Sequence, residues 1–459
     1  MKKKILIAAA VLASASILAQ DAPKEEAKNP FKFSGAAYAY GAMYKTTTKD
    51  QSSSYGAYRF RPYFSYVTDN VEATVKLEID QVFGGSKNNS KYSVSNASVD
   101  GSTAGAAHTH TATVSGNGQQ ADVGNDEKAV EVKAAFLKFK VPQIAGLSVK
   151  GGVDEYKTVG GFTCGTELGH GLVNYKTDML DLTLIAAKVW EPNYLDTKGD
   201  EKTEKNDVTF YGADATLKVN DEIKLRPALY LIQSEKNQNP DDSKVAFVGK
   251  TAMIPSIGAN MKFGDVSLDF AGAYGSCAKD KNDIKYSGYA IDLSPAYKVS
   301  DEMKVGGFFT LLSGDDGSST TKDKSFANFT LKADGWGRMY LLENMQTFNN
   351  AGDHAFADIR GNSCGYILAG AFFSYKISDV ELKAQGAWGR LNKVPSGAKK
   401  DLGVEIDGQV SYEVEKNAKL IFECAYLATG KAFGEDGVIN TTTEKQGALY
   451  SALGMSYKW

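Results

Sequence analysis

The amino-acid sequence predicts an all-β fold, a transmembrane antiparallel β-barrel of about 18 strands, with 16 as the alternative count, short periplasmic turns and long extracellular loops. Three observations support this prediction. Apolar and polar residues alternate along many segments, short and long connections alternate between these segments, and an export-type leader precedes a chain without long apolar runs. Together they favour a closed barrel over an exported soluble β-protein.

The segment Leu402–Val414 shows the alternation most clearly. Its even positions, from Leu402 to Val414, are apolar or glycine, and its odd positions include Glu405, Asp407 and Glu413. Successive side chains of a strand point to opposite faces, so one face is apolar and the other polar. The segment also exceeds the roughly 5–6 residues of an average soluble strand. We expect the apolar face to contact lipid and the polar face to line a water-filled lumen.

The same alternation recurs along the chain. In Ala418–Thr429 the apolar face carries Leu420, Phe422, Cys424 and Tyr426, opposite Lys419 and Glu423. Gly447–Trp459 closes the sequence in the same way. The other strands are expected at Phe31–Tyr44, Tyr55–Val67, Val71–Phe83, Ala129–Val141, Leu147–Tyr156, Gly171–Thr177, Leu180–Trp190, Asp207–Val219, Ile223–Gln233, Ser256–Phe263, Val266–Gly275, Tyr286–Val299, Met303–Ser313, Cys364–Ile377 and Val380–Leu391.

The connections between these strands differ systematically in length. Every second one is a short turn, for example Thr68–Asn70, Asp178–Met179 and Ser378–Asp379. The intervening connections are long and polar, as at 84–128 and 314–363. Tight turns at one rim and long loops at the other are typical of outer-membrane barrels, whereas a soluble sandwich has no reason to segregate its loops.

The amino terminus predicts export. Residues 1–19 read as a signal peptide, with a basic start at Lys2–Lys4, an apolar stretch at Ile5–Leu12 and a small-residue cleavage site at Ala19. Residues 20–30 are charged and are expected to be a flexible periplasmic segment, followed by a single barrel domain over 31–459. The apolar stretch is shorter than the about 20 residues of a spanning helix, and the mean hydropathy of −0.31 leaves no such helix elsewhere.

Composition and charge agree with this class. The chain contains 24 Tyr and 22 Phe, residue types that form aromatic girdles at membrane interfaces. The formal net charge is −3, and it becomes −6 when the three lysines of the signal peptide are removed. So small a charge argues against nucleic acid as a partner and predicts only a weak preference for cations.

A cleavable leader, alternating strands with short turns and long loops, and a last strand ending in Tyr457 and Trp459 resemble the bacterial outer-membrane β-barrel porin class. That class usually ends in Phe, so Trp459 departs from its pattern. The resemblance implies insertion into the outer membrane of a Gram-negative-type cell after Sec export, with Tyr457 and Trp459 read by the barrel-insertion machinery. Leu311–Asp316 is similar to a short segment of large substrate-specific porins; no subfamily is assigned.

Polar residues of the lumen-facing parity are the candidate pore-lining residues. If four residues connect the second and third strands, Arg61 lies opposite Glu78 and Arg59 lies opposite Asp80, close enough to pair. Such pairs either brace the wall or set a transverse field across the pore. The lumen carries both signs of charge, so no strong ion selectivity is expected. The full candidate set is Arg59, Arg61, Glu72, Lys76, Glu78, Asp80, Lys224, Arg226, Glu381, Lys383, Glu405 and Asp407.

The long connection at 314–363 is the best candidate for a constriction loop, because its many apolar residues need cover. Met339–Phe348 has apolar positions near helical spacing and predicts a short helix. The connection either folds into the barrel as a constriction or drapes over the rim as a lid or subunit contact. Glycine-rich Thr158–His170 is the second candidate. The constriction-loop candidates are Trp336, Arg338, Tyr340, Glu343 and Asp353.

The sequence therefore predicts an outer-membrane porin that acts as a passive diffusion channel for small hydrophilic solutes or ions. The alternative is a surface-exposed barrel that acts as an adhesin or partner-binding protein through its long loops. No nucleophile motif is present, so neither an enzyme nor a cofactor is expected. The oligomeric state is left open between a monomer and a homotrimer.

Two further patterns predict no site. His108-Thr109-His110 has no third ligand nearby, and Asp315-Asp316 with Asp323 lacks the spacing of a calcium-binding loop, so no metal is expected.

Four cysteines allow three disulfide connectivities, and the sequence does not choose among them. These cysteines are Cys164, Cys277, Cys364 and Cys424.

Overall fold

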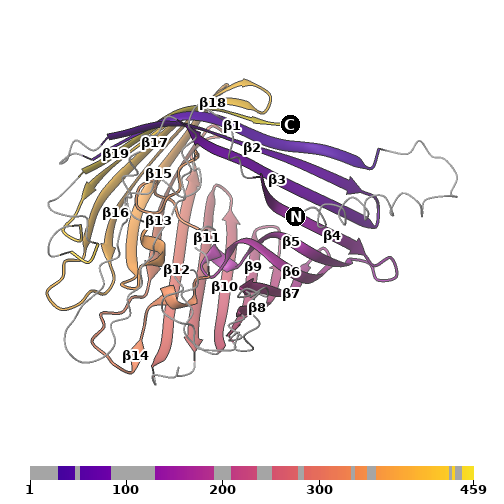
Figure 1. The fold of residues 1–459 in the computed structure, drawn as a ribbon, viewed down its shortest axis with the longest axis horizontal. Helices are drawn as coiled ribbons and strands as arrows, with labels where there is room; N and C mark the ends of the chain where they lie inside the picture. The colour runs from indigo at the N-terminus through magenta and orange to yellow at the C-terminus, as the bar shows by residue number, and fades with distance from the viewer. Residues whose placement is uncertain are drawn as a thin grey trace, which may run out of the picture.

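The computed structural model describes residues 29–46, 52–83, 130–190, 208–234, 251–277, 284–331, 336–348, 358–433, 437–439 and 447–459. The long strands form one antiparallel sheet that closes on itself, because the first strand pairs with the last (Figure 1). The predicted fold class is confirmed as an all-β closed barrel of 18 strands. Among the described residues, none belongs to a helix that is long and apolar enough to cross a membrane.

The barrel strands follow one another around the wall in chain order. They are β1 (Phe31–Thr46), β2 (Ser52–Val67), β3 (Val71–Phe83), β4 (Val130–Lys140), β5 (Leu147–Lys157), β6 (Gly165–Lys176), β7 (Leu180–Trp190), β8 (Val208–Lys218), β9 (Ile223–Ser234), β10 (Thr251–Phe263), β11 (Val266–Cys277), β12 (Lys285–Lys298), β13 (Met303–Leu312), β15 (Tyr366–Ile377), β16 (Val380–Leu391), β17 (Asp401–Glu415), β18 (Ala418–Thr429) and β19 (Gly447–Lys458). The short elements are η1 (Val159–Gly161), β14 (Lys322–Asp323), η2 (Phe326–Phe329) and η4 (Ile359–Gly361).

The outer face of the barrel is apolar, as the alternation predicted. In β17, Ile406 and Val414 are 59% and 62% exposed, whereas Glu405 on the inner face is fully buried. Leu402 is an exception, and its predicted outward orientation is wrong: it is fully buried. The ladder with β16 skips Leu402, and Gly403 adopts φ +99°, so a bulge reverses the alternation at this end of the strand.

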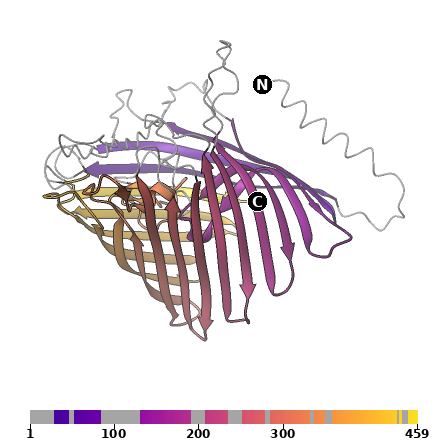
Figure 2. The same cartoon turned by 90° about the horizontal axis from the view of Figure 1, so that it is seen from below.

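Short turns and long connections lie at opposite ends of the strands, which we call the turn rim and the loop rim (Figure 2). At the turn rim, a polar side chain just after one strand often accepts hydrogen bonds from backbone N–H groups of the turn and of the next strand. Asn220 Oδ1 accepts hydrogen bonds from the N–H groups of Glu222 and Ile223, and Ser300 Oγ accepts one from Met303. The predicted segregation of short turns and long connections is confirmed.

Several strands begin earlier than predicted, and β6 and β10 differ most from the prediction. β6 begins at Gly165 rather than Gly171, because its residues pair with β5 despite several glycines of low strand propensity. β10 begins at Thr251 rather than Ser256 and runs through Pro255. The ladder with β11 skips Pro255, since proline has no N–H to donate, whereas pairing with β9 continues.

The barrel closes where the last strand meets the first. Trp459 and Gly35 exchange two backbone hydrogen bonds of 3.1 and 3.2 Å. The indole of Trp459 stacks on Phe60 with ring centroids 5.3 Å apart and lies 5.9 Å from the ring of Phe33. A side chain at Gly35 would overlap the Trp459 ring, so glycine leaves room for the closing residue.

Cys164, Cys277 and Cys364 are buried, and Cys424 is partly exposed on the outer face of β18. Burial also raises the pKa of the Cys364 thiol to about 12, so the nucleophilic thiolate is scarce at neutral pH. We expect a water-soluble maleimide to leave Cys164, Cys277 and Cys364 unlabelled in the folded protein and to label them after reduction and unfolding, as located by mass spectrometry. Rapid labelling of Cys164, Cys277 or Cys364 in the folded barrel would contradict this burial.

Candidate functional site: a lumen narrowed by two inner loops

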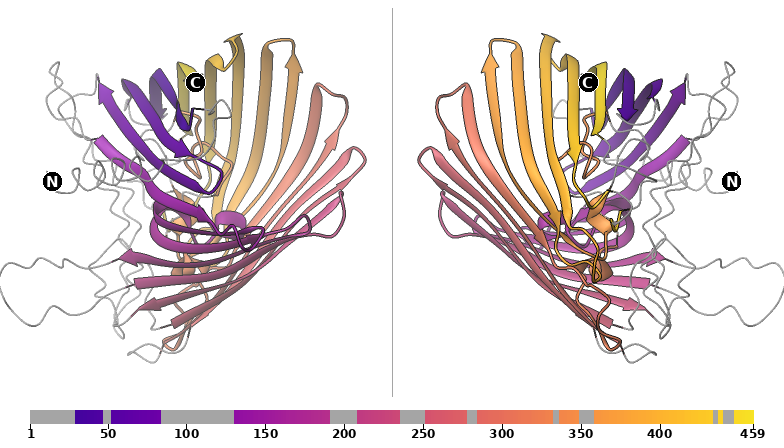
Figure 3. Two further views of the ribbon diagram at one scale, coloured as in Figure 1. Left: turned by 90° about the vertical axis from the view of Figure 1, so that its right-hand side faces the viewer. Right: turned by 90° about the vertical axis from the view of Figure 1, so that its left-hand side faces the viewer.

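The connection from β13 to β15 spans residues 313–365. Its described parts, 313–331, 336–348 and 358–365, are here called the inner loop and fold onto the inner face of the barrel (Figure 3). Their first residue fixes the departure from the wall: Ser313 Oγ accepts a hydrogen bond from Tyr289 N–H and donates one to the Lys324 carbonyl, both 2.8 Å. A side chain at Gly314 would collide with the Cys364 backbone, so glycine keeps the two ends of the loop together.

The second half of the inner loop crosses several strands. The Arg338 guanidinium lies over the Phe308 ring of β13 at 5.3 Å, and the Gln385 amide of β16 donates to the Arg338 carbonyl at 2.6 Å. Phe348, further along, stacks on Tyr40 of β1 with ring centroids 4.9 Å apart. The predicted alternative of a connection that only drapes over the rim does not match these contacts, because the inner loop reaches the wall inside the barrel.

Residues 158–164, here called the second inner loop, also fold inwards. Val159 N–H donates to the Tyr230 hydroxyl of β9 at 2.9 Å, and that hydroxyl donates to Asp214 of β8 at 2.7 Å. Asp214 also accepts from Arg226 Nε at 2.8 Å. Only the first part of the predicted Thr158–His170 loop is therefore a loop, because 165–170 belong to β6.

The two inner loops join each other inside the barrel. Thr330 Oγ1 donates to the Phe162 carbonyl at 3.0 Å, and Leu331 N–H donates to the Thr163 carbonyl at 2.7 Å. The Phe162 ring packs edge-on against Trp336 with centroids 5.4 Å apart. A continuous apolar layer therefore lies inside the barrel and replaces part of the open lumen that the sequence predicted.

The inner face of β2–β4 carries a charged cluster, here called the charged wall. Glu78 accepts a hydrogen bond from Arg61 Nε and pairs with Lys133 at 3.2 Å, and Arg59 pairs with Asp80 at 2.7 Å. The pairing predicted from the turn length is confirmed. The ion pairs run along one wall rather than across the lumen, which is the arrangement expected of side chains that brace the barrel.

A second group of charges continues this surface towards the turn rim. Asp154 of β5 pairs with Lys150 at 3.0 Å and with Lys76 at 3.5 Å. Lys76 lies 5.5 Å above the Tyr63 ring of β2 and is still 35% exposed. These ammonium groups are neutralised but accessible, so they offer water and solutes a polar surface.

The other predicted pore-lining residues occupy varied surroundings. Lys224 is exposed, and Glu381 pairs with Lys383 at 3.1 Å. Glu72 accepts a hydrogen bond from the Thr74 hydroxyl at 3.4 Å. Arg226 is held by Asp214. All five point to the inner face, as the parity predicted, but Arg226 supports the second inner loop.

Glu405 and Asp407 point inwards but do not meet an open lumen. They are 0% and 2% exposed, because the inner loop covers them and donates backbone N–H groups to their carboxylates. Their predicted place as pore-lining residues is therefore revised: they lie between the wall and the inner loop.

Two of the constriction-loop candidates support the inner loop from within. Trp336 is 7% exposed and stacks on Tyr366 with parallel rings 5.9 Å apart. Glu343 is 1% exposed and accepts hydrogen bonds from the Tyr366 hydroxyl at 2.6 Å and from Arg338 N–H at 2.7 Å. These contacts stabilise the loop and leave Trp336 and Glu343 little surface for a solute.

Two other candidates lie at the surface of the inner loop. Arg338 is 24% exposed and pairs with Asp292 of β12 at 2.6 Å. Tyr340 is partly exposed. Asp353, the last candidate, lies outside the described residues. Arg338 and Tyr340 are the candidates that solutes can reach.

The predicted helix at Met339–Phe348 is absent. The segment forms turns, and Asn344 adopts φ +56°, which interrupts helical geometry. Late N–H groups of the segment, such as that of Phe348, donate to Glu423 of the wall instead of to a carbonyl four residues earlier. The prediction was wrong because acceptors from distant strands replace those of the helix.

Some glycines of the inner wall leave space into which aromatic rings of the inner loop pack. The sequence analysis did not predict this role for the glycines. A methyl group at Gly275 would overlap the Phe329 ring of η2, and one at Gly454 would overlap the Phe348 ring. Both glycines occupy inner-face positions of predicted strands, where a missing side chain leaves space for a neighbour. Glycine at the inner parity was therefore a usable signal that a loop packs there.

The described residues offer no group of three metal-ligating side chains. Asp315 is already used by the backbone, since its two oxygens accept from Gly317 N–H at 2.7 Å and Lys324 N–H at 2.9 Å. Asp316 likewise accepts from Ser318 N–H at 3.1 Å. The histidines of the His108-Thr109-His110 motif lie outside the described residues.

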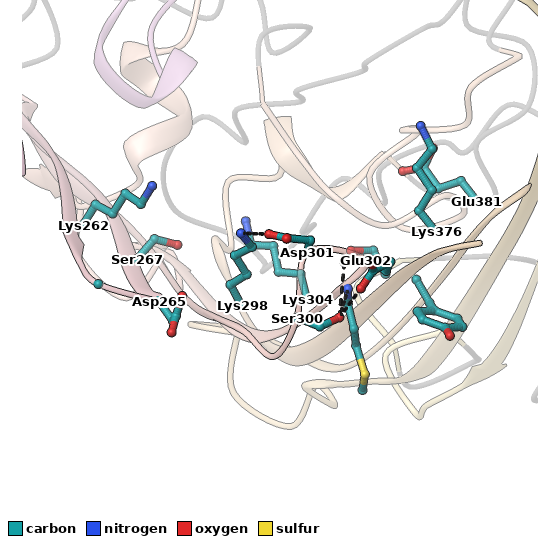
Figure 4. Close-up of a pocket in the computed structure, with 14 residues that line it drawn as sticks. Lys262, Asp265, Ser267, Lys298, Ser300, Asp301, Glu302, Lys304, Lys376 and Glu381 are labelled. Carbon is teal, nitrogen blue, oxygen red and sulfur yellow. Dashed lines mark hydrogen bonds and ion pairs between the residues drawn. The ribbon is translucent and has the colours of Figure 1, made fainter. Parts of the chain in front are cut away.

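A recess of about 490 Å³ opens on the inner face at the turn rim (Figure 4). Basic and acidic side chains both line it, and Lys298 is paired with Asp301. The equal numbers of the two signs give this end of the lumen no evident preference for one ion. The charged lining residues are Lys262, Asp265, Lys298, Asp301, Glu302, Lys304, Lys376 and Glu381.

A closed 18-stranded antiparallel barrel with an apolar outer face and a polar, loop-narrowed interior defines the porin-type class of outer-membrane barrels. Several solved structures share this fold. Acinetobacter baumannii OccAB1 has a TM-score of 0.55 and 12% identity over 95% of this chain and 100% of its own. Pseudomonas aeruginosa OpdL has a TM-score of 0.54 and 10% identity, and the match covers 94% of this chain and 98% of OpdL. P. aeruginosa OpdQ has a TM-score of 0.53 and 13% identity, and the match covers 94% of this chain and 97% of OpdQ.

These similarities confirm, at the level of the fold, the resemblance to the outer-membrane porin class that the sequence predicted. The identities are too low to carry over any residue or solute. No protein-family model and no curated protein sequence matches the chain.

Proposed function

We propose that the chain is an outer-membrane porin, a passive diffusion channel for small hydrophilic solutes or ions. One observation supports this function above the others. Inside a barrel whose other strands are partly covered by two loops, Arg61, Lys76 and Lys133 remain 34%, 35% and 26% exposed. A charged, accessible strip beside an apolar layer is the lining that a narrow water-filled path requires.

The proposal extends to location and assembly. The apolar outer face contacts outer-membrane lipid, and the turn rim faces the periplasm. Residues 1–19 direct Sec export and are removed, and residues 20–30 remain as a periplasmic segment. Tyr457 and Trp459, which pack at the seam of the barrel, are recognised by the insertion machinery.

Reconstitution tests the channel. In planar bilayers the folded protein should produce stable, equal steps of current, because a single barrel offers a path of fixed width. Liposomes containing it should swell in small sugars or amino acids, more slowly as the solute grows. A folded barrel that inserts, as shown by heat-modifiable gel mobility, but gives neither current nor swelling would overturn the proposal in favour of a loop-mediated adhesin.

A further inference from the structure

Two carboxylates of β17 hold the turn of the inner loop by its backbone. The Glu405 oxygens accept from Leu341 N–H at 2.6 Å and from Leu342 N–H at 2.9 Å. Asp407 accepts from Tyr340 N–H at 3.1 Å. Three consecutive amide groups therefore end on two side chains of one strand, as amide groups do at a capped helix start.

A third carboxylate, on the neighbouring strand β18, repeats the arrangement. Glu423 accepts from Thr347 N–H at 3.0 Å and from Phe348 N–H at 3.2 Å. The Tyr450 hydroxyl of β19 donates to the same carboxylate at 2.8 Å and fixes its orientation. The inner loop is thus attached at two places to adjacent strands.

Because the three carboxylates and the loop amides are buried together, each group depends on the other for its hydrogen bonds. Glu405 and Glu423 are fully buried, Asp407 is 2% exposed, and within the described part of the chain no basic side chain pairs with any of them. A buried carboxylate without a cation needs hydrogen-bond donors, and a buried amide without a helix needs acceptors. The loop amides and the wall carboxylates satisfy one another.

Packing on the same side supports the docked position independently. Phe348 stacks on Tyr40 and fills the space above Gly454. The Gln409 amide of β17 donates to the Thr347 hydroxyl at 2.5 Å. Residues 347 and 348 of the inner loop are therefore held against the wall by specific packing and hydrogen bonding.

We propose that Glu405, Asp407 and Glu423 are positioning residues that set the width of the pore by holding residues 340–348 against the wall. This inference rests on the proposed channel function. On either side of residues 340–348 the inner loop is fixed: Thr330 and Leu331 bond to the second inner loop, and Cys364 packs against Gly314. When the carboxylate contacts are weakened, the segment between them leaves the wall and intermittently enters the lumen.

Glu423→Gln is the test, because glutamine keeps the size of the side chain but offers one acceptor oxygen and turns its NH₂ towards the second loop amide. Single channels of the parent should stay at one open level. In Glu423→Gln the fraction of time spent in partial closures should rise by about tenfold or more. Unchanged, quiet channels would overturn the proposal.

Glu413→Gln is the matched control. It makes the same substitution on the inner face of β17, and within the described residues no hydrogen bond or ion pair joins the Glu413 side chain to the inner loop. Its channels should match the parent. Partial closures in both Glu423→Gln and Glu413→Gln would show that the loss of a negative charge causes them. The loss of hydrogen bonds to the inner loop would then not be the cause, and the proposal would also be overturned.

A crosslink provides rescue. Thr347→Cys with Gln409→Cys, whose native side chains touch, should form a disulfide under oxidation. In the Glu423→Gln background the oxidised channel should return to one level, and reduction should restore the closures. Closures that persist in the crosslinked channel would show that the loop position is not their cause.

The same cysteine pair separates this inference from the channel function. If the parent carries no current, the proposed function fails, and the rate of crosslinking in the folded barrel still reports docking. That rate should fall in Glu423→Gln and not in Glu413→Gln. Equal rates in the two variants would overturn the positioning role whether or not the barrel conducts.

Discussion

Replacing Glu78 by glutamine should make the pore about two- to fourfold more permeable to anions relative to cations, as expected for one unit charge roughly 5 Å from a hydrated ion in screened water. Glu78 is the shared partner of Arg61 and Lys133 and lies 3.3 Å from Arg59. Its neutralisation leaves their positive charge uncompensated at the charged wall. The reversal potential across a KCl gradient measures the change.

The conservative variant Glu78→Asp serves as the control, because it keeps the negative charge and changes only the reach of the side chain. Its reversal potential should stay close to that of the parent. An unchanged reversal potential in Glu78→Gln, with the barrel folded, would mean that permeating ions do not pass along the charged wall.

Asp214→Asn is expected to release the second inner loop. Asp214 is 5% exposed and holds Arg226 and Tyr230, which in turn bind the Lys157 carbonyl and Val159 N–H. Losing one member of a largely buried ion pair should cost about 1–3 kcal/mol, less than for a fully buried pair because Arg226 is 34% exposed. Urea titration of the reconstituted barrel measures the loss.

Limited proteolysis tests whether the second inner loop itself is released in Asp214→Asn. Lys157 is exposed at the start of the second inner loop, so trypsin should cut after it faster once the loop is released. Tyr230→Phe is the matched variant: it removes the hydroxyl but keeps the pair of Asp214 and Arg226, and should accelerate cleavage less. Equal cleavage in all three proteins would show that these side chains do not hold the loop.

Much of the barrel was predictable from the sequence because each strand carries its own signal. β3, β7, β16 and β18 have the predicted bounds, since their alternation is regular and polar turns flank them. The pairing of Arg59 with Asp80 followed from turn length alone, because a tight turn fixes the register of a hairpin.

The prediction failed where partners distant in the sequence decide the geometry. The start of β6 depends on pairing with β5, and the burial of Leu402 depends on a bulge opposite β16. The helix predicted near Met339 was prevented by carboxylates about 65 residues later in the chain.

The candidate site was predicted in part for the same reason. Parity identified the inner-face residues, including Glu405 and Asp407, because orientation is a local property of a strand. Whether such a residue meets water or another segment depends on the path of the inner loop. That path is set by aromatic rings and glycines from several strands, which no single window of sequence displays.

The seam at Trp459 and Gly35 joins the two strands that are furthest apart along the chain. Sealing the cylinder must therefore wait until every other strand has been delivered and ordered, which makes it a slow, late step of assembly. Until then, β1 and β19 each expose a row of unsatisfied amide and carbonyl groups, the kind of edge that recruits foreign strands. Safe maturation of this protein consequently depends on shielding two strand edges until the seam has formed.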